Sequence, residues 1–238
     1  MQKTFFRLST RLKIGNLLPA FGLVPALAML ALAAVATAAE LAATNFASAS
    51  CPSLTHDTQG HVVLSFIQEK NSQESVVAYA ISDDQGQSFK LPIEIPSSRG
   101  VYPHGESAPK LIFKASGEVI AVWGISNPRP ANKYSGLVRY AQSFDGGKTF
   151  GKATALVRDP AGVDQRYFDV AVLPSGEAGI TWLDSRKKSS KKGSSLYFAA
   201  TRGRQGFQSE RPLYEGTCEC CRTALFVDHA NGIHAAFR

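Results

Sequence analysis

The sequence predicts an all-β fold, a β-propeller of the six-bladed type with four-stranded blades, of which this chain supplies about three and a half. Three observations support this prediction. A hairpin pattern recurs about every 58 residues, a second family of alternating strands lies between the hairpins, and turn residues stand at every joint without any long helical pattern. One such blade cannot cover both of its faces, so consecutive blades are expected to pack against each other.

The recurring hairpin consists of an apolar strand, a polar turn that ends in glycine, and a second apolar strand closed by an aromatic residue. The turn glycines are 57, 59 and 56 residues apart, and three of the four aromatics follow their glycine by six residues. The hairpins cover residues 52–67, 109–124, 168–183 and 224–238, with glycines Gly60, Gly117, Gly176 and Gly232 and aromatics Phe66, Trp123, Trp182 and Phe237.

A third strand follows each of the first three hairpins, over residues 76–82, 137–143 and 195–201. A turn and a fourth strand are expected after it, which completes a four-stranded unit. Six units of this length would need roughly 350 residues. The chain ends after the first hairpin of its fourth unit, so we expect it to be a partial propeller.

The turn after the third strand carries the most specific motif, S-x-D-x-G-x-[ST]-[FW]. Its aspartate can accept backbone N–H groups within the turn, its glycine can adopt a positive φ, and its aromatic ring can pack between sheets. A third copy over residues 201–207 keeps the phase of the repeat but has lost the aspartate. The two complete copies contain Ser82, Asp84, Gly86 and Phe89, and Ser143, Asp145, Gly147 and Phe150.

These turns and their phase resemble the Asp-box, or bacterial neuraminidase repeat, of the sialidase superfamily, over about residues 50–238. The resemblance implies an enzyme that hydrolyses terminal sialic acid from glycans without a required cofactor. It also implies that the Asp-box is a structural turn remote from the catalytic face, so Asp84 and Asp145 are not expected to be catalytic. The alternative function is a non-catalytic propeller that binds a glycan or another ligand, or that handles a metal through its thiols.

Loops that enter the first strand of each blade meet at one end of a propeller's channel, where a ligand is expected. Arg166 and Arg222 occupy the same place in adjacent units, four residues before the matched apolar residues Val170 and Phe226, and Arg186 follows the second strand of the third unit. A guanidinium can hold a carboxylate with two parallel hydrogen bonds. These three arginines are therefore the candidate binding residues for a glycan or a small anionic ligand. A solvated network of loop ion pairs is the alternative.

The resemblance further implies a tyrosine nucleophile and a carboxylic acid that donates a proton. Tyr167 is the candidate nucleophile, and Asp169, Asp184 and Glu106 are the candidate proton donors, because all four lie at the channel end that carries the arginines. A tyrosine nucleophile differs from the two-carboxylate scheme of most glycosidases.

Four cysteines form a second candidate site. Cys218, Cys220 and Cys221 lie within four residues, and the repeat register places Cys51 at the same channel end. Adjacent cysteines are poorly placed to pair with each other, so a disulfide between Cys51 and one of the three is the favoured expectation. A copper or zinc site formed by the thiolates, and a redox-active or unpaired thiol, are the alternatives.

The N-terminal residues 1–39 match a secretory signal. Four cations precede an apolar stretch over residues 17–39, which ends in Ala-Thr-Ala-Ala. An uncleaved membrane anchor is the alternative, since the stretch is about long enough to span a bilayer. We expect an exported protein, periplasmic or secreted, with a linker over residues 40–50, a propeller over 51–238, and membrane contact only through the N-terminal segment.

The charge of the chain argues against a nucleic-acid partner. Its formal net charge is +7, but this falls to +3 when the four N-terminal cations are removed. A small positive charge spread over a globular domain does not form the basic surface that nucleic acid requires.

Overall fold

The structure is a computed structural model of the chain, and it describes residues 46–128, 134–158, 164–186 and 191–238. The chain divides into two units, Met1–Leu41 and Ala42–Arg238, and all described residues belong to the second. The expected signal segment, residues 1–39, therefore lies outside the described residues. Among the residues that the structure does describe, no helix has both the length and the apolar character needed to cross a membrane.

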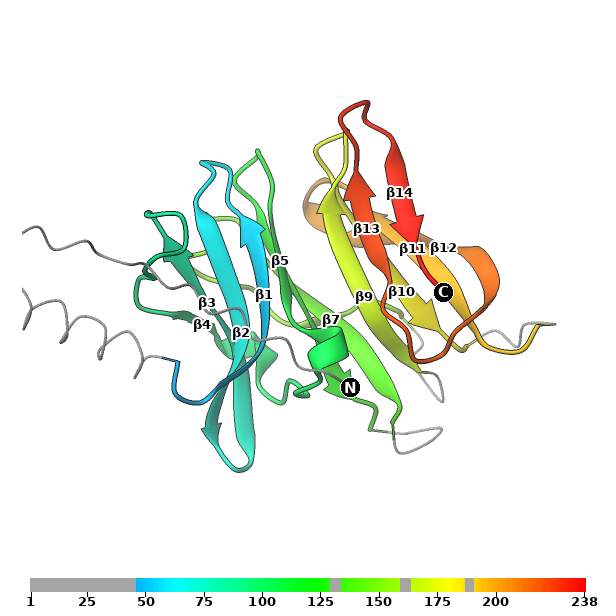
Figure 1. Cartoon of the computed structure of the whole chain (residues 1–238), viewed down its shortest axis with the longest axis horizontal. Coiled ribbons are helices and arrows are strands. Elements are labelled where there is room, and N and C mark those ends of the chain that lie inside the picture. Colours follow the sequence, from blue (N-terminus) through cyan, green and yellow to red (C-terminus); the bar gives the residue numbers. More distant parts are fainter. Residues whose placement is uncertain (1–45, 129–133, 159–163, 187–190) are drawn as a thin grey trace, which may run out of the picture. The chain divides into compact units, whose positions relative to one another are not determined.

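Three four-stranded antiparallel sheets and one two-stranded sheet follow each other along the chain (Figure 1). Each four-stranded sheet has its strands in sequence order, and we call these sheets blades 1 to 3 and the last pair hairpin 4. Blade 1 contains β1 (Ala49–His56), β2 (Val62–Asn71), β3 (Glu74–Ser82) and β4 (Ile93–Ile95). Blade 2 contains β5 (Lys110–Phe113), β6 (Val119–Ser126), β7 (Gly136–Ser143) and β8 (Thr154–Ala155).

Blade 3 contains β9 (Gln165–Val172), β10 (Ala178–Asp184), β11 (Ser194–Thr201) and β12 (Phe207–Thr217), and hairpin 4 contains β13 (Ala224–Val227) and β14 (Ile233–Ala236). Short 3-10 turns occur at η1 (Pro96–Ser98), η2 (Gly105–Ser107) and η3 (Gly203–Gln205). The predicted all-β propeller fold is confirmed, and hairpin 4 supplies the two strands β13 and β14. β1 begins at Ala49, two residues before the expected start of the propeller.

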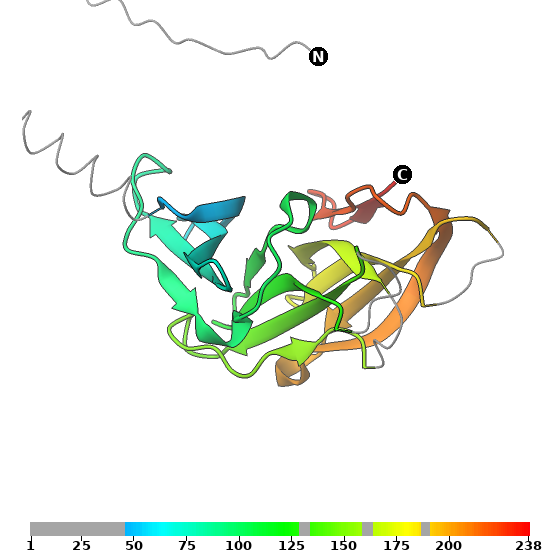
Figure 2. The same cartoon turned by 90° about the horizontal axis from the view of Figure 1, so that it is seen from below.

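The first strands of consecutive blades lie beside each other, β1 next to β5, β5 next to β9, and β9 next to β13. Figure 2 shows the sheets following one another in chain order, from the blue and cyan of blade 1 to the red of hairpin 4. Hydrogen bonds from polar groups also connect neighbouring blades. The Ser65 hydroxyl donates to the carbonyl of Pro109 at 2.8 Å, and the backbone N–H of Tyr167 donates to the Ser107 hydroxyl at 3.2 Å. The loops before β5, β9 and β13 therefore come close together, as the repeat register predicts.

Apolar side chains from both neighbours fill the space between two blades. Tyr79 of blade 1 and Trp123 of blade 2 belong to one buried cluster, and Tyr140 of blade 2 and Trp182 of blade 3 belong to the next. Both tryptophans are almost completely buried. The repeated aromatic residues are therefore the contacts that join each blade to the next, as expected for sheets that must cover one another.

Gly147, the turn glycine of the second motif, contacts the neighbouring blade and is also required by its own turn. The Tyr79 hydroxyl donates to the carbonyl of Gly147 at 2.8 Å, and Gly147 has a φ of 93°. A Cβ atom at Gly147 would lie 2.5 Å from the Tyr79 oxygen, which is closer than any side chain tolerates. Gly206 of the degenerate third copy, with a φ of 74°, makes the same close approach to Tyr140.

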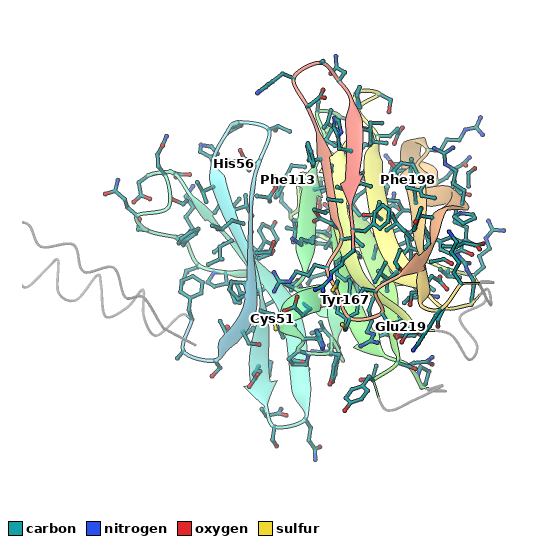
Figure 3. All side chains as sticks on the ribbon, turned by 45° about the vertical axis from the view of Figure 1, so that its right-hand side comes forward. Cys51, His56, Phe113, Tyr167, Phe198 and Glu219 are labelled. Carbon is teal, nitrogen blue, oxygen red and sulfur yellow. The ribbon has the colours of Figure 1, made fainter. Side chains whose placement is uncertain are left out.

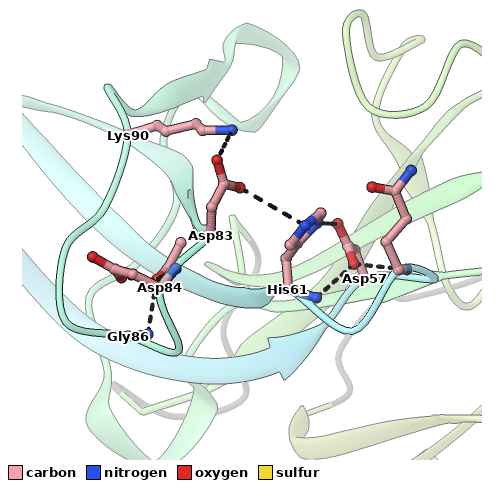
Figure 4. A network of polar contacts seen from close by, with 8 residues as sticks. Asp57, His61, Asp83, Asp84, Gly86 and Lys90 are labelled. Atoms are coloured by element: carbon pink, nitrogen blue, oxygen red, sulfur yellow. Dashed lines mark hydrogen bonds and ion pairs between the residues drawn. The ribbon is translucent and has the colours of Figure 1, made fainter.

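Both complete motif turns contain the same set of hydrogen bonds. The carboxylate of Asp84 accepts from the hydroxyl of Ser88 at 2.5 Å and from its backbone N–H at 2.8 Å. The hydroxyl of Ser82 accepts from the N–H of Gly86 at 2.7 Å, and Figure 4 shows Asp84 and Gly86 in this turn. Asp145 accepts the corresponding bonds from Thr149 at 2.5 and 2.9 Å. These hydrogen bonds lower the pKa of each aspartate to about 2, and the bond from the Ser88 or Thr149 hydroxyl has the largest effect.

The third turn replaces its missing aspartate with a residue from another hairpin. Glu177, in the turn between β9 and β10, accepts from the hydroxyl of Thr201 and from the N–H of Gly203. The Glu177 carboxylate also forms an ion pair with the Nζ of Lys114 in blade 2 at 2.8 Å, and the same Nζ pairs with Glu118 at 2.7 Å. The bond to Lys114 is the main reason that the pKa of Glu177 falls to about 2.

The two aspartate turns predict a specific acid sensitivity. Each aspartate has a folded-state pKa of about 2, below the unfolded value of about 3.9. Their stabilisation is therefore complete above about pH 4 and is lost as the pH falls toward 2. A variant with both Asp84→Asn and Asp145→Asn should lose less stability over this interval than the wild type. Urea midpoints measured from pH 5 to pH 2 test this, and parallel curves would contradict it.

Candidate functional site

A pocket of about 380 Å³ lies among the first strands of blade 2, blade 3 and hairpin 4. Its charged lining residues are Glu106, Lys110, Asp169, Arg222 and Arg238, and we call it the inner-strand pocket. Two expected proton donors and one expected binding arginine thus lie in one cavity. Lys110 and Asp169 lie on the first strands β5 and β9, and Glu106 and Arg222 lie in the segments that enter β5 and β13; all come together because these strands lie side by side.

Lys110 and Asp169 face each other across the first strands of blades 2 and 3. Each residue directly precedes the matched apolar residue of its repeat, Leu111 or Val170, and the Lys110 Nζ lies 3.4 Å from the Asp169 Oδ1. The other oxygen of Asp169 accepts from the N–H of Leu225 on β13 at 2.9 Å. Sequence reasoning missed Lys110, although the register comparison that found the arginines also aligns it with Asp169.

Arg222 and Glu106 form an exposed ion pair at the edge of this pocket. The Nε of Arg222 donates to the Glu106 carboxylate, and its Nη2 donates to the carbonyl of Gly105 at 3.1 Å. The hydrogen bond from Arg222 is the main cause that lowers the pKa of Glu106. Glu106 is therefore ionised at neutral pH and acts as a hydrogen-bond acceptor there. This geometry does not fit its expected role as a proton donor.

The guanidinium of Arg166 is already occupied by a carboxylate from its own chain. Its Nε lies 2.8 and 2.9 Å from the two oxygens of Asp164, and its Nη2 donates to the same carboxylate at 2.5 Å. Asp164 also accepts from the backbone N–H of Gly136 at 2.9 Å. The remaining Nη1 donates to the hydroxyl of Tyr167 at 3.0 Å. Arg166 thus positions Tyr167, and it does not line the inner-strand pocket.

Tyr167 lies in a β-bulge of β9 with a left-handed φ of 58°. Cys51 occupies the same place in the repeat and also has a positive φ, 53°, beside a register shift. The Tyr167 carbonyl accepts from the hydroxyl of Thr223 at 2.6 Å, and its ring packs edge-on against His104. Burial raises the pKa of Tyr167, so its hydroxyl keeps its proton at neutral pH. It does not line the inner-strand pocket.

Asp184 and Arg186 form a buried pair away from the inner-strand pocket. Asp184 is completely buried and accepts from the Trp182 Nε1 at 3.0 Å and from the N–H of Arg186 at 2.8 Å. The Arg186 guanidinium reaches Glu210 at 2.9 Å and stacks over the ring of Tyr197. Burial raises the pKa of Asp184. Its expected catalytic role does not fit this position, and the alternative of a solvated loop network does not fit it either.

The three expected binding arginines do not form one cluster of free guanidinium groups. Each has its own carboxylate partner, and only Arg222 lines the inner-strand pocket. The partners are Asp164 for Arg166, Asp184 and Glu210 for Arg186, and Glu106 for Arg222.

The cysteines separate into a group of three and a single residue. The sulfur of Cys218 lies 3.3 Å from that of Cys220 and 3.1 Å from that of Cys221. Cys51 packs instead against the apolar cluster between blades 1 and 2, and all four cysteines are free thiols. The favoured disulfide between Cys51 and the group is therefore not formed in this structure. Cys51 and Glu219 are labelled in Figure 3, where Glu219 marks the position of the group of three because it stands between Cys218 and Cys220 in the sequence.

The three neighbouring thiols do not have equal acidity. The backbone N–H of Cys220, together with both neighbouring thiols, lowers the pKa of Cys218 to about 7. The Cys221 thiol donates a hydrogen bond to the Cys218 sulfur, which raises the pKa of Cys221 to about 11. Cys218 thus becomes a thiolate, the form that reacts and binds metals, at lower pH than Cys221 does.

No protein-family model and no curated protein matches this chain. Solved structures do match its fold. An α-L-arabinanase of Penicillium chrysogenum, complexed with arabinobiose, is 14% identical with a TM-score of 0.56 over 79% of this chain and 58% of its own length. An endo-arabinase from Bacteroides thetaiotaomicron is 13% identical with a TM-score of 0.51 over 78% of this chain and 68% of its own.

The Hadza microbial sialidase Hz136 is similar to the same extent. It is 13% identical with a TM-score of 0.51 over 75% of this chain, which spans 39% of the sialidase. At these identities the likeness concerns the fold. The chain has a β-propeller fold similar to that of these proteins, and it spans less than two thirds of the length of the arabinanase and sialidase first described.

Proposed function

We propose that this chain is an exported propeller that binds a glycan in the inner-strand pocket. The observation that carries the proposal is the meeting of two carboxylates (Glu106, Asp169) and three cations (Lys110, Arg222, Arg238) from three consecutive repeats in one cavity of about 380 Å³. Carboxylate oxygens accept hydrogen bonds from sugar hydroxyls, while ammonium and guanidinium groups donate to them. Phe237, which is exposed, also lines this pocket and offers apolar surface to a sugar ring.

The cations in the pocket favour a sugar that carries a carboxylate. Lys110 is paired with Asp169 at 3.4 Å, and Arg222 is exposed at the edge of the pocket. Both cations can turn toward an incoming anion without leaving a buried charge unpaired, because neither is enclosed. We therefore place acidic glycans, sialosides among them, ahead of neutral ones as the ligand class.

A titration with matched sugars tests this binding. We expect 3′-sialyllactose to bind more tightly than lactose or arabinobiose, and Lys110→Gln to weaken its binding roughly tenfold or more, since a hydrogen bond to a charged group contributes about 1.5–3 kcal/mol. Lys148→Gln is the matched control because Lys148 is exposed and lies outside the pocket. Isothermal titration calorimetry provides the affinities. Equal affinities for the two variants, or no binding of any of the three sugars, would contradict the proposal.

Hydrolysis of terminal sialic acid is the second candidate function. It is favoured by the cationic lining of the pocket and by the Asp-box-like turns. Asp169 is the carboxyl group that the pocket offers as a proton donor for this reaction, because Arg222 keeps Glu106 ionised. Release of fluorophore from a fluorogenic sialoside, reduced by at least 100-fold in Asp169→Asn, is the expected result if the protein is a sialidase. Binding of sialosides without any release would reject hydrolysis and leave the binding proposal in place.

A further inference from the structure

The loop between β12 and β13 brings three thiols to one point. The sulfurs of Cys218, Cys220 and Cys221 all lie within 4.8 Å of one another. Thiolates that share one ion bind it at about 2.3 Å, so their sulfurs are then about 3.8–4.0 Å apart. The two shortest separations, 3.1 and 3.3 Å, differ from this spacing by less than 1 Å. Small side-chain rotations therefore suffice to direct all three sulfurs at one ion.

This loop is held at both ends without the help of an ion. The hydroxyl of Thr217 donates to the carbonyl of Ser194 at 2.9 Å, and the hydroxyl of Thr223 donates to the carbonyl of Tyr167 at 2.6 Å. Both threonines are buried. Between them Cys220 is exposed, so an ion can reach the sulfurs directly from solvent. The folded blade thus restricts the loop before binding, which lowers the entropy cost of forming a site.

We propose that Cys218, Cys220 and Cys221 form a binding site for a soft, thiophilic cation, copper(I) in particular. Thiolates select copper(I) and zinc over hard cations. Within the part of the chain that the structure describes, no histidine, carboxylate or fourth cysteine completes this group. Zinc takes four ligands in its structural sites, whereas three thiolates satisfy the trigonal geometry that copper(I) accepts. The three sulfurs do not line the inner-strand pocket, so this site is independent of the proposed glycan binding.

The proposal is tested with the full chain, reduced and kept under anaerobic conditions. The probe is copper(I) held by a chromophoric chelator of known affinity, with a zinc(II) titration as the parallel arm. We expect one copper(I) per chain, taken from the chelator, with weaker binding of zinc. Cys218→Ser should lower the copper affinity by more than about 100-fold, since even outer-shell partners of a metal typically contribute 10–100-fold.

Cys51→Ser is the matched control, because Cys51 is a free thiol packed in the apolar cluster between blades 1 and 2. It should keep the full copper stoichiometry, and circular dichroism should show that both variants fold. The proposal is overturned if reduced protein with four titratable thiols takes no copper from the chelator. It is also overturned if a folded variant with serine at 218, 220 and 221 binds copper as the wild type does, or if zinc binds more tightly than copper.

Discussion

Replacing Lys114 with methionine should lower the free energy of unfolding by about 3–5 kcal/mol, the usual cost of breaking a buried ion pair by removing one partner. Only 5% of the Lys114 side chain is exposed, and its ammonium lies 2.7 Å from Glu118 and 2.8 Å from Glu177. Burial lowers the pKa of Lys114, but its bonds to both glutamates outweigh this and raise it. Without the lysine, two carboxylates face each other between blades 2 and 3.

The control for this substitution is an ion pair at the surface. Lys70 pairs with Glu94, and both side chains are about two-fifths exposed. Lys70→Met should therefore cost less than about 1 kcal/mol. Guanidinium chloride unfolding of the two variants measures both losses. Equal losses would mean that the Lys114 cluster does not join the blades as the structure describes.

Replacing Trp182 with alanine should also cost about 3–5 kcal/mol, the usual range for a fully buried tryptophan. Its side chain is completely buried in the cluster between blades 2 and 3, and its ring stacks on Tyr197 with centroids 5.6 Å apart. Its indole N–H also donates to the buried carboxylate of Asp184. The alanine variant therefore leaves both a cavity and a buried carboxylate with one donor fewer.

Trp182→Phe separates these two contributions. Phenylalanine keeps most of the ring volume but cannot donate to Asp184, so its loss should be clearly smaller than that of the alanine variant. Thermal and denaturant unfolding of both proteins provide the comparison. If the two substitutions destabilise the protein equally, packing between the blades is not the main contribution of Trp182.

The repeat was sufficient to predict the fold because a blade is a local unit. Strands expected over residues 76–82, 137–143 and 195–201 appear as β3, β7 and β11, since alternation and turn residues specify them within each copy. That each copy packs on the next was predictable, because both faces of each sheet must be covered. The individual contacts between elements were not predictable, because the contacting residues lie far apart in the sequence; for example, Glu177 completes the turn that begins at Thr201.

The position of the candidate site could be predicted from the sequence, but the partners of its residues could be predicted only in part. Glu106, Asp169 and Arg222 do line one pocket, because the register fixes which loops meet. Arg166 was harder to interpret, since its partner Asp164 comes from the same loop and carries no repeat signal. The burial of Asp184 could have been predicted. It follows Trp182 by two residues in one strand, and such residues face the same side of a sheet.

A crystal structure of the protein grown with 3′-sialyllactose would show whether neighbouring first strands form a glycan-binding pocket. We expect β5, β9 and β13 to lie side by side, with the sugar in contact with Lys110 and Arg222. A sugar bound elsewhere on the protein, or first strands that are not adjacent, would contradict this expectation.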